Sequence, residues 1–119
     1  MPKTAIIALL ALISLALPVA PAMAHHSWSG YDKSKPLKLS GTVTEVSYAY
    51  PHATIRLDVE GKKWLAVLAP PARLSSRGIG SDDIKVGDRA TVEGYPSRKD
   101  ATEMRVERIT LDGKVYELR

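Results

Sequence analysis

Short apolar stretches separated by turn residues are the feature that most limits what this chain can fold into. The clearest is residues 53–60, where apolar side chains alternate with polar and charged ones. Strict alternation is typical of a strand with one buried face. Comparable stretches occur at residues 37–48, 63–69, 89–95, 102–111 and 115–118. The sequence therefore predicts an all-β domain.

In two of these stretches the apolar residues change between odd and even positions partway along. In residues 37–48 this change of alternation falls between Val43 and Val46. A similar change occurs within residues 102–111. A change of parity within one strand predicts a β-bulge, which bends the strand and lets it serve both sides of a barrel.

A short helix is predicted after the third strand, over residues 71–77. Proline suits a first helical turn, and Gly78 suits the left-handed residue after a helix end. Asp112 and Gly113 form a two-residue turn into the last strand. Three strands, a helix, two strands and a terminal hairpin arm predict a small OB-like five-stranded Greek-key barrel. A plain β-sandwich is the alternative, but it leaves the helix without an explanation.

The N-terminal segment has the three parts of a secretory signal. Lys3 supplies a positive start, residues 5–17 are apolar apart from one serine, and residues 22–24 (Ala-Met-Ala) form a cleavage site. The apolar run is too short to span a membrane, which takes about 20 residues. We expect residues 1–24 to be a signal peptide, 25–36 an irregular lead-in and 37–119 the barrel. The processed protein is then periplasmic or secreted and does not span the membrane.

Composition narrows the class of protein further. The chain has no cysteine and a formal net charge of +4, spread along its length. An exported chain of this kind gains no disulfide support. Its positive charge supports solubility, and we expect no nucleic-acid partner outside the cytoplasm.

Several short motifs resemble a known family. They are the HHSW start at residues 25–28, residues 41–44, residues 51–53, Trp64, Leu74 with Arg77 and Gly78, Gly87 with Asp88, and residues 92–95. In these segments the chain is similar to a family of small exported bacterial proteins with a domain of unknown function. The family often has Asn before the Pro-His pair, where this chain has Tyr50. The resemblance implies an exported single domain and no established activity.

The chain has three histidines, and cleavage after Ala24 would make two of them the first residues of the mature protein. The freed α-amino group of His25 and its imidazole are both nitrogen donors when neutral. His26 adds a second imidazole. His52 lies in the turn between the first two strands, which in OB barrels borders the usual ligand-binding face. If the lead-in folds back, His25 or His26 can share one metal ion with His52, and we expect His25, His26 and His52 as the metal ligands.

Nitrogen ligands without a thiolate favour copper, with zinc or nickel less favoured, because Cu(II) heads the stability order. The arrangement is similar to copper sites that begin at a processed N-terminal histidine. The plainer interpretation is that the terminal histidines are solvated and that His52 only hydrogen bonds locally. Met104 is expected in the core and not as a copper ligand, and Trp64 is expected in the core as well.

The leading hypothesis is therefore a transition-metal-binding module, with copper favoured, that transports, stores or delivers its ion. No acid–base pair is evident, so an oxidative copper enzyme or a hydrolase is a distant alternative. The second hypothesis is a non-metal binding or scaffold module of the cell envelope, which recognises an envelope protein, a glycan or a small ligand through the open barrel face.

Overall fold

The computed structural model describes residues 28–119, which form six strands and two short helices. The elements are η2 (Trp28–Gly30), β1 (Leu37–Ser47), β2 (Thr54–Val59), β3 (Lys62–Val67), α1 (Pro71–Ser76), β4 (Arg89–Pro96), β5 (Glu103–Leu111) and β6 (Lys114–Glu117). The predicted signal peptide, its cleavage site, His25 and His26 lie outside the described residues.

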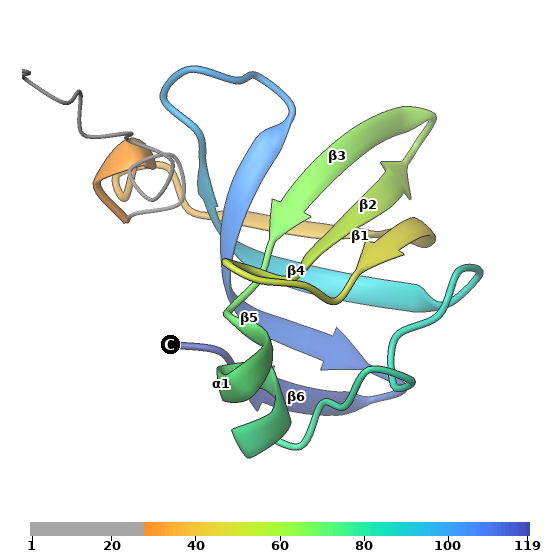
Figure 1. The fold of residues 1–119 in the computed structure, drawn as a ribbon. Coiled ribbons are helices and arrows are strands. Elements are labelled where there is room, and N and C mark those ends of the chain that lie inside the picture. Colours follow the sequence, from red (N-terminus) through yellow and green to blue (C-terminus); the bar gives the residue numbers. More distant parts are fainter. Residues whose placement is uncertain (1–27) are drawn as a thin grey trace, which may run out of the picture.

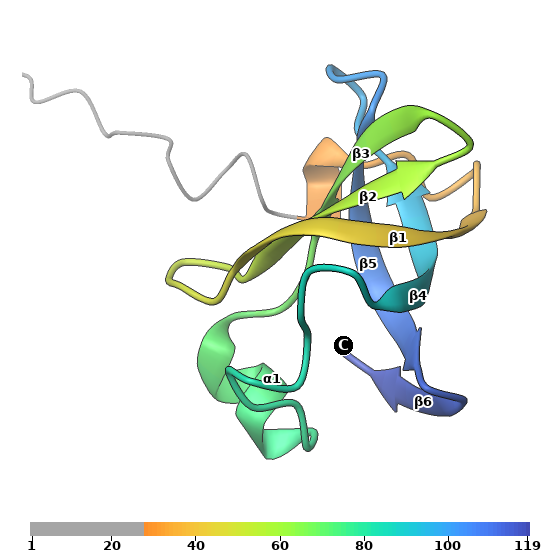
Figure 2. The ribbon, with the colours of Figure 1, turned by 90° about the vertical axis from the view of Figure 1, so that its right-hand side faces the viewer.

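The sheet closes into a barrel (Figure 1). Its strand order is β3-β2-β1-β4-β5-β6, and β3 also pairs with β5 in parallel, which joins the two ends of the five-stranded part. In both views α1 and the segment after it lie at the lower end of the barrel (Figure 2). The prediction of an OB-like all-β barrel, with one short helix between the third and fourth strands and a terminal hairpin, is confirmed.

Strand β1 is long enough to serve two neighbours. Its first half pairs with β4 and its second half with β2, and Thr44 is the extra residue between the pairs Val43–Leu57 and Glu45–Arg56. This bulge is where the change of parity predicts it. Gly41 lies at the crossing point, and a Cβ there would sit 2.3 Å from the carbonyl oxygen of Asp58. Only glycine lets the two strands approach so closely.

Strand β5 has the second predicted bulge. Glu93 of β4 pairs with Arg108 and Gly94 pairs with Val106, so Glu107 is the extra residue. Because the bulge interrupts the alternation, both Glu107 and Arg108 remain partly exposed while Val106 and Ile109 are buried.

The core fills the barrel and is covered by α1. Leu74 of α1 and the two isoleucines that follow the helix, Ile79 and Ile84, are buried with the strand residues. Gly78 has a φ of 96° and ends the helix as predicted, and the amide of Ile79 donates to the carbonyl of Leu74. Apolar side chains from the helix segment therefore complete the core.

Two residues that the sequence assigns to the core differ in burial. Met104 is fully buried, as predicted. Trp64 is half-buried and packs against the edge of the core, with the ammonium of Lys62 over its ring at 5.2 Å. This position lets the indole cover the core while one edge of the ring meets water.

Candidate functional site

His52 lies in the turn between β1 and β2, as the sequence predicts. It follows the cis peptide bond between Tyr50 and Pro51 and precedes the buried Ala53. The amide of Ala53 donates to the carbonyl of Ala69, and the amide of Leu68 donates to the carbonyl of Ala53. His52 is half-buried, and its Nδ1 atom is enclosed by protein. The turn therefore holds this imidazole at the end of β3.

The other two predicted ligands, His25 and His26, lie outside the described residues. Among residues 28–119, no group of three or more histidine, aspartate or glutamate side chains is placed to hold a metal ion. The three-histidine site therefore remains a prediction.

The lead-in, from Trp28 onward, packs along the outside of the barrel beside β4 and β5. Tyr31 pairs with Ser97 as an isolated bridge, and the amide of Asp32 donates to the carbonyl of Pro96. The amide of Arg98 donates back to the carbonyl of Gly30. Figure 1 shows this orange segment on the outer side of the barrel. The lead-in is thus fixed to the fold from Trp28 onward.

Trp28 is surrounded by charged and aromatic side chains. The guanidinium carbons of Arg105 and Arg119 each lie 4.6 Å from the centroid of its ring. The ring of Tyr95 meets it edge to face, with centroids 6.2 Å apart and an interplanar angle of 73°. Cation–π and edge-to-face contacts are both attractive, because the indole face is electron-rich and the ring edge is electron-poor.

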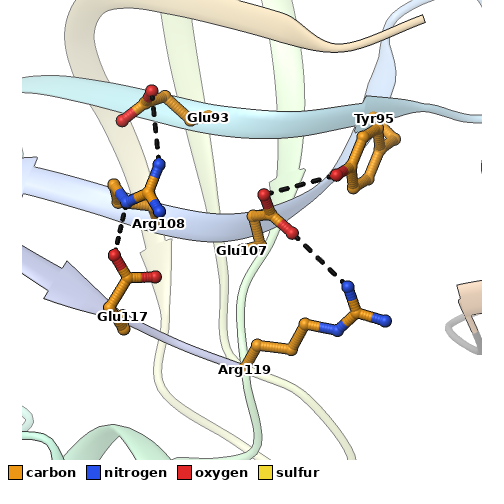
Figure 3. Close-up of polar contacts among 6 residues, drawn as sticks. All are labelled: Glu93, Tyr95, Glu107, Arg108, Glu117 and Arg119. Carbon is orange, nitrogen blue, oxygen red and sulfur yellow. Dashed lines mark hydrogen bonds and ion pairs between the residues drawn. The ribbon is translucent and has the colours of Figure 1, made fainter. Parts of the chain in front are cut away.

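Glu107, the bulged residue of β5, links this group together (Figure 3). Its carboxylate accepts a hydrogen bond from the hydroxyl of Tyr95 at 3.3 Å and pairs with Nη1 of Arg119 at 3.6 Å. The main-chain carbonyl of Arg119 accepts a hydrogen bond from Nη2 of Arg77 at 2.8 Å. Arg119 is therefore held at both its backbone and its side chain.

A separate ion-pair group lies beside it on the same surface. Arg108 is hydrogen-bonded to Glu117 through Nε, and its Nη1 lies 3.6 Å from Glu93 (Figure 3). The hydrogen bond to Glu117 and the neighbouring carboxylates raise the pKa of Arg108. This group joins β4, β5 and β6, and Arg108 also interacts with the charge of Glu107.

The side chain of Arg105, beneath the ring of Trp28, is buried, and its burial changes its pKa. Arg105 is only 4% exposed although it occupies an outward position between Met104 and Val106. Desolvation lowers its pKa, and the charges of Arg73 and Arg119 lower it further. At this end of β5 two guanidinium groups lie against the Trp28 ring, and the carboxylate of Glu107 pairs with one of them.

An open depression of about 700 Å³ lies between the loop at residues 82–88 and the turn at residues 112–113. Two of its carboxylates are used by the local backbone: Asp83 accepts from the amide of Gly80, and Asp88 accepts from the amide of Lys85. These hydrogen bonds fix the conformation of the loop. The depression is an open surface in contact with solvent.

Comparison of the chain with models of protein families shows the family to which it belongs. The model of the "Family of unknown function (DUF6152)" matches residues 11–106. The chain belongs to this family. Membership confirms the resemblance to a family with a domain of unknown function. No protein among the curated sequences matches this member of the family.

Solved structures similar to this DUF6152 member show the same fold. The ZRD-deleted mutant of TiaS in complex with agmatine has a TM-score of 0.55 and 18% identity, over 73% of this chain and 27% of that one. The complex of TiaS with tRNA and ATP has a TM-score of 0.52 and 18% identity, over 68% of this chain and 19% of that one. Apo TiaS, a tRNA agmatidine synthetase, has a TM-score of 0.51 and 17% identity, over 67% of this chain and 18% of that one. The DUF6152 chain spans 27% or less of these proteins, so the likeness concerns the barrel alone.

Within residues 28–119 of this family member, no helix has the length and apolar character needed to cross a membrane. Trp28 and Tyr50 are the aromatic residues that lie two positions from His26 and from His52 in the sequence. Tyr50 is 71% exposed, whereas Trp28 packs on Arg105 and Arg119. The sequence did not indicate Arg105, because an outward arginine in an alternating strand is normally solvated. It did not indicate Arg119 either, because this residue lies beyond β6 and far from Trp28 in the sequence.

Proposed function

We propose that the mature protein is a periplasmic or secreted OB-barrel module that binds a transition metal ion, with copper favoured over zinc or nickel. The ligands are the α-amino group and side chain of His25, the side chain of His26, and His52. The protein transports, stores or delivers the ion. The observation that carries the proposal is the contact of Trp28 with Arg105, because it fixes Trp28 near the end of β3.

The strand register supports this proximity. Arg105 pairs with Val67 of β3, and Val67 pairs with Thr54 of β2, two residues after His52. Neighbouring strands lie about 4.8 Å apart, so Arg105 and Thr54 are separated by about 10 Å. The segment from His25 to Trp28 can reach about 10 Å when extended. The strand that carries the Trp28 contact thus lies two strand spacings from the strand that begins after His52, which supports a common site for the three histidines.

The donor set suits the proposed ion. A terminal amine and an imidazole on one residue close a chelate ring, and two further imidazoles complete a set made of nitrogen alone. Imidazole suits copper, zinc and nickel, and Cu(II) binds such sites most tightly. Because amine and imidazole must be deprotonated to bind, the affinity should fall as the pH is lowered.

The experiment uses the full precursor, exported and processed in a bacterial host. Intact mass first establishes that the mature chain begins at His25, and Cu(II) affinity is then measured by competition with a chromophoric chelator at neutral pH. The substitutions His25→Ala and His52→Ala should each weaken binding at least about ten-fold, since each removes an imidazole ligand. Tyr50→Ala, in the same turn but exposed, is the matched control and should bind as the wild type does.

Two results would overturn the metal proposal. One is a mature chain that begins at another residue. The other is equal, weak Cu(II) affinity in the wild type, His25→Ala and His52→Ala. The second result would favour a module that binds a non-metal envelope ligand.

A further inference from the structure

Four arginine side chains from three separate parts of the chain come together in the fold. They are Arg73 and Arg77 of the α1 segment, Arg105 of β5 and Arg119 after β6. Nη2 of Arg77 donates to the main-chain carbonyl of Arg119 at 2.8 Å. The guanidinium carbons of Arg105 and Arg119 each lie 4.6 Å from the centroid of the Trp28 ring, so they lie within twice that distance of each other. We call these four residues the arginine cluster.

The charges in the arginine cluster act on one another. Desolvation lowers the pKa of Arg105 most, and the charge of Arg73 lowers it further, ahead of the charge of Arg119. The exposed Arg73 therefore lies close to Arg105. Two carboxylates occupy the same region: Glu107 pairs with Arg119 at 3.6 Å, and Glu103 is hydrogen-bonded to the lead-in. Four guanidinium groups beside two carboxylates leave an excess of positive charge.

The exposed members of the cluster have hydrogen-bond donors for a ligand. The contact of Arg119 with Trp28 engages the charge of the guanidinium and does not use its N–H donors. A guanidinium carries five such donors, and the bond to Glu107 engages Nη1. Arg73 is exposed on α1. These two side chains can therefore donate to a group placed between them.

The helix alone does not account for this arrangement. Arg73 and Arg77 lie at the end of α1, where the last carbonyl groups attract positive charge. That attraction explains each residue on the helix, but it does not explain why Arg105 and Arg119 come to the same place from β5 and from the end of the chain. Like charges brought together cost free energy, and an anion among them offsets that cost.

We propose that the arginine cluster is a binding site for a phosphate group, which accepts hydrogen bonds from Arg73 and Arg119 while the buried charge of Arg105 adds to the attraction. A phosphate group is anionic at neutral pH, and its oxygens accept paired, charge-assisted bonds from guanidinium groups. Arg77 is a positioning residue, because it holds the backbone of Arg119. The inference goes beyond the proposed metal binding and does not depend on it.

The phosphate comes from one of two sources with the same chemistry, inorganic phosphate or the headgroup of an envelope phospholipid. The experiment therefore uses two probes on the exported and processed chain, without added metal and in about 0.1 M salt, which screens distant charges. Isothermal titration calorimetry measures the affinity for inorganic phosphate. Co-sedimentation measures binding to phosphatidylglycerol vesicles, with phosphatidylcholine vesicles as the reference of zero net charge.

Two substitutions test the proposed donors. Arg73→Gln and Arg119→Gln should each weaken binding at least about ten-fold, because each removes charged hydrogen bonds to the phosphate. Arg73→Gln is the cleaner variant, since Arg119 also contacts Trp28. Arg73→Lys keeps the charge but loses the paired donors, so its affinity should be intermediate.

Arg56→Gln is the matched control. Arg56 is also exposed and makes an ion pair, with Glu45 at 3.1 Å, but it lies on β2. The substitution makes the same change of net charge, and this variant should bind as the wild type does. Thermal unfolding without phosphate establishes that each variant remains folded.

The outcomes separate the two sources from failure. Calorimetric binding that is weakened in Arg73→Gln and kept in Arg56→Gln supports a site for free phosphate. The same pattern with phosphatidylglycerol vesicles alone supports a headgroup site. The proposal is overturned if the wild type binds neither probe, if Arg73→Gln binds as the wild type does, or if Arg56→Gln is weakened as much as Arg73→Gln.

Discussion

The phenol of Tyr31 donates a hydrogen bond to Oε2 of Glu103 at 2.8 Å, joining the lead-in to the start of β5. Tyr31 is 1% exposed, so the lead-in contributes one side chain that is as buried as those of the core. Together with the backbone bonds to Pro96 and Gly30, this contact makes residues 28–36 part of the folded unit.

Tyr31→Phe keeps the buried ring and removes only the hydroxyl. We expect the free energy of unfolding to fall by about 1–3 kcal/mol, because Glu103 loses a charged hydrogen bond at a site with little water. Urea unfolding of the variant measures this difference. Tyr50→Phe removes a hydroxyl from an exposed ring and should unfold at the wild-type urea concentration; an equal change in the two variants would contradict the role of the buried bond.

The same tyrosine should make the protein sensitive to alkali. Burial, followed by the hydrogen bond to Glu103 and its charge, raises the pKa of Tyr31. The folded protein therefore holds this proton more tightly than the unfolded chain does. The contribution to stability is complete below the unfolded pKa of about 10 and is lost as the pH rises toward the folded value.

Measured from about pH 8 to about pH 11.5, the free energy of unfolding of the wild type should fall more steeply above about pH 10 than that of Tyr31→Phe. Lysine titration is common to both proteins, so the difference between the two curves isolates the phenol. Parallel curves would contradict an ionisation coupled to burial.

Gly94 makes β4 and β5 approach more closely than any side chain allows. A Cβ at this position would lie 1.8 Å from the carbonyl oxygen of Arg105. Gly94→Ala must therefore displace backbone at the β5 bulge, and we expect a loss of at least about 3 kcal/mol or failure to fold. Gly61→Ala is the control: it has open space but a φ of 85°, and should cost only about 1–2 kcal/mol. Thermal unfolding of both proteins tests the contrast.

The fold could be predicted because its determinants are local in the sequence. Alternation marks the strands, and changes of parity mark the bulges at Thr44 and Glu107. The proline at the start of α1 and Gly78 at its end mark the helix. The connectivity then follows from the order of the elements, since few closed barrels accommodate a helix between the third and fourth strands.

The contacts of Trp28 with Arg105 and Arg119 could not be predicted in the same way. Arg105 stands between Met104 and Val106 at an outward position, where an arginine is ordinarily solvated. It is buried because Trp28, distant in the sequence, covers it. The polar composition of residues 25–36 also conceals the single buried ring of Tyr31. Of the predicted metal ligands, only His52 lies within the described residues, in the turn that the sequence indicates.

The terminal hairpin should be an integral part of the barrel and not a loose arm. Leu118 is 1% exposed, and its amide donates to the carbonyl of Glu107 at the bulge. Leu118→Ala should lower the free energy of unfolding by about 2–5 kcal/mol, because it leaves a cavity in the core. Val115→Thr, on the exposed side of the same hairpin, should change it by about 0.5 kcal/mol or less. Similar small effects at both positions, measured by urea unfolding, would show that the arm folds separately.

Met104 gives the sharpest test of whether sulfur takes part in metal binding. Its side chain is fully buried in the barrel, where it is a packing residue. Met104→Leu nearly conserves volume and should cost less than about 1.5 kcal/mol, whereas Met104→Ala should cost about 2–5 kcal/mol. Because the thioether is enclosed in the core, Met104→Leu should leave the Cu(II) affinity that we propose for the processed chain unchanged. A large loss of Cu(II) affinity in this well-folded variant would require the sulfur to reach the ion, and the nitrogen-only ligand set would be wrong.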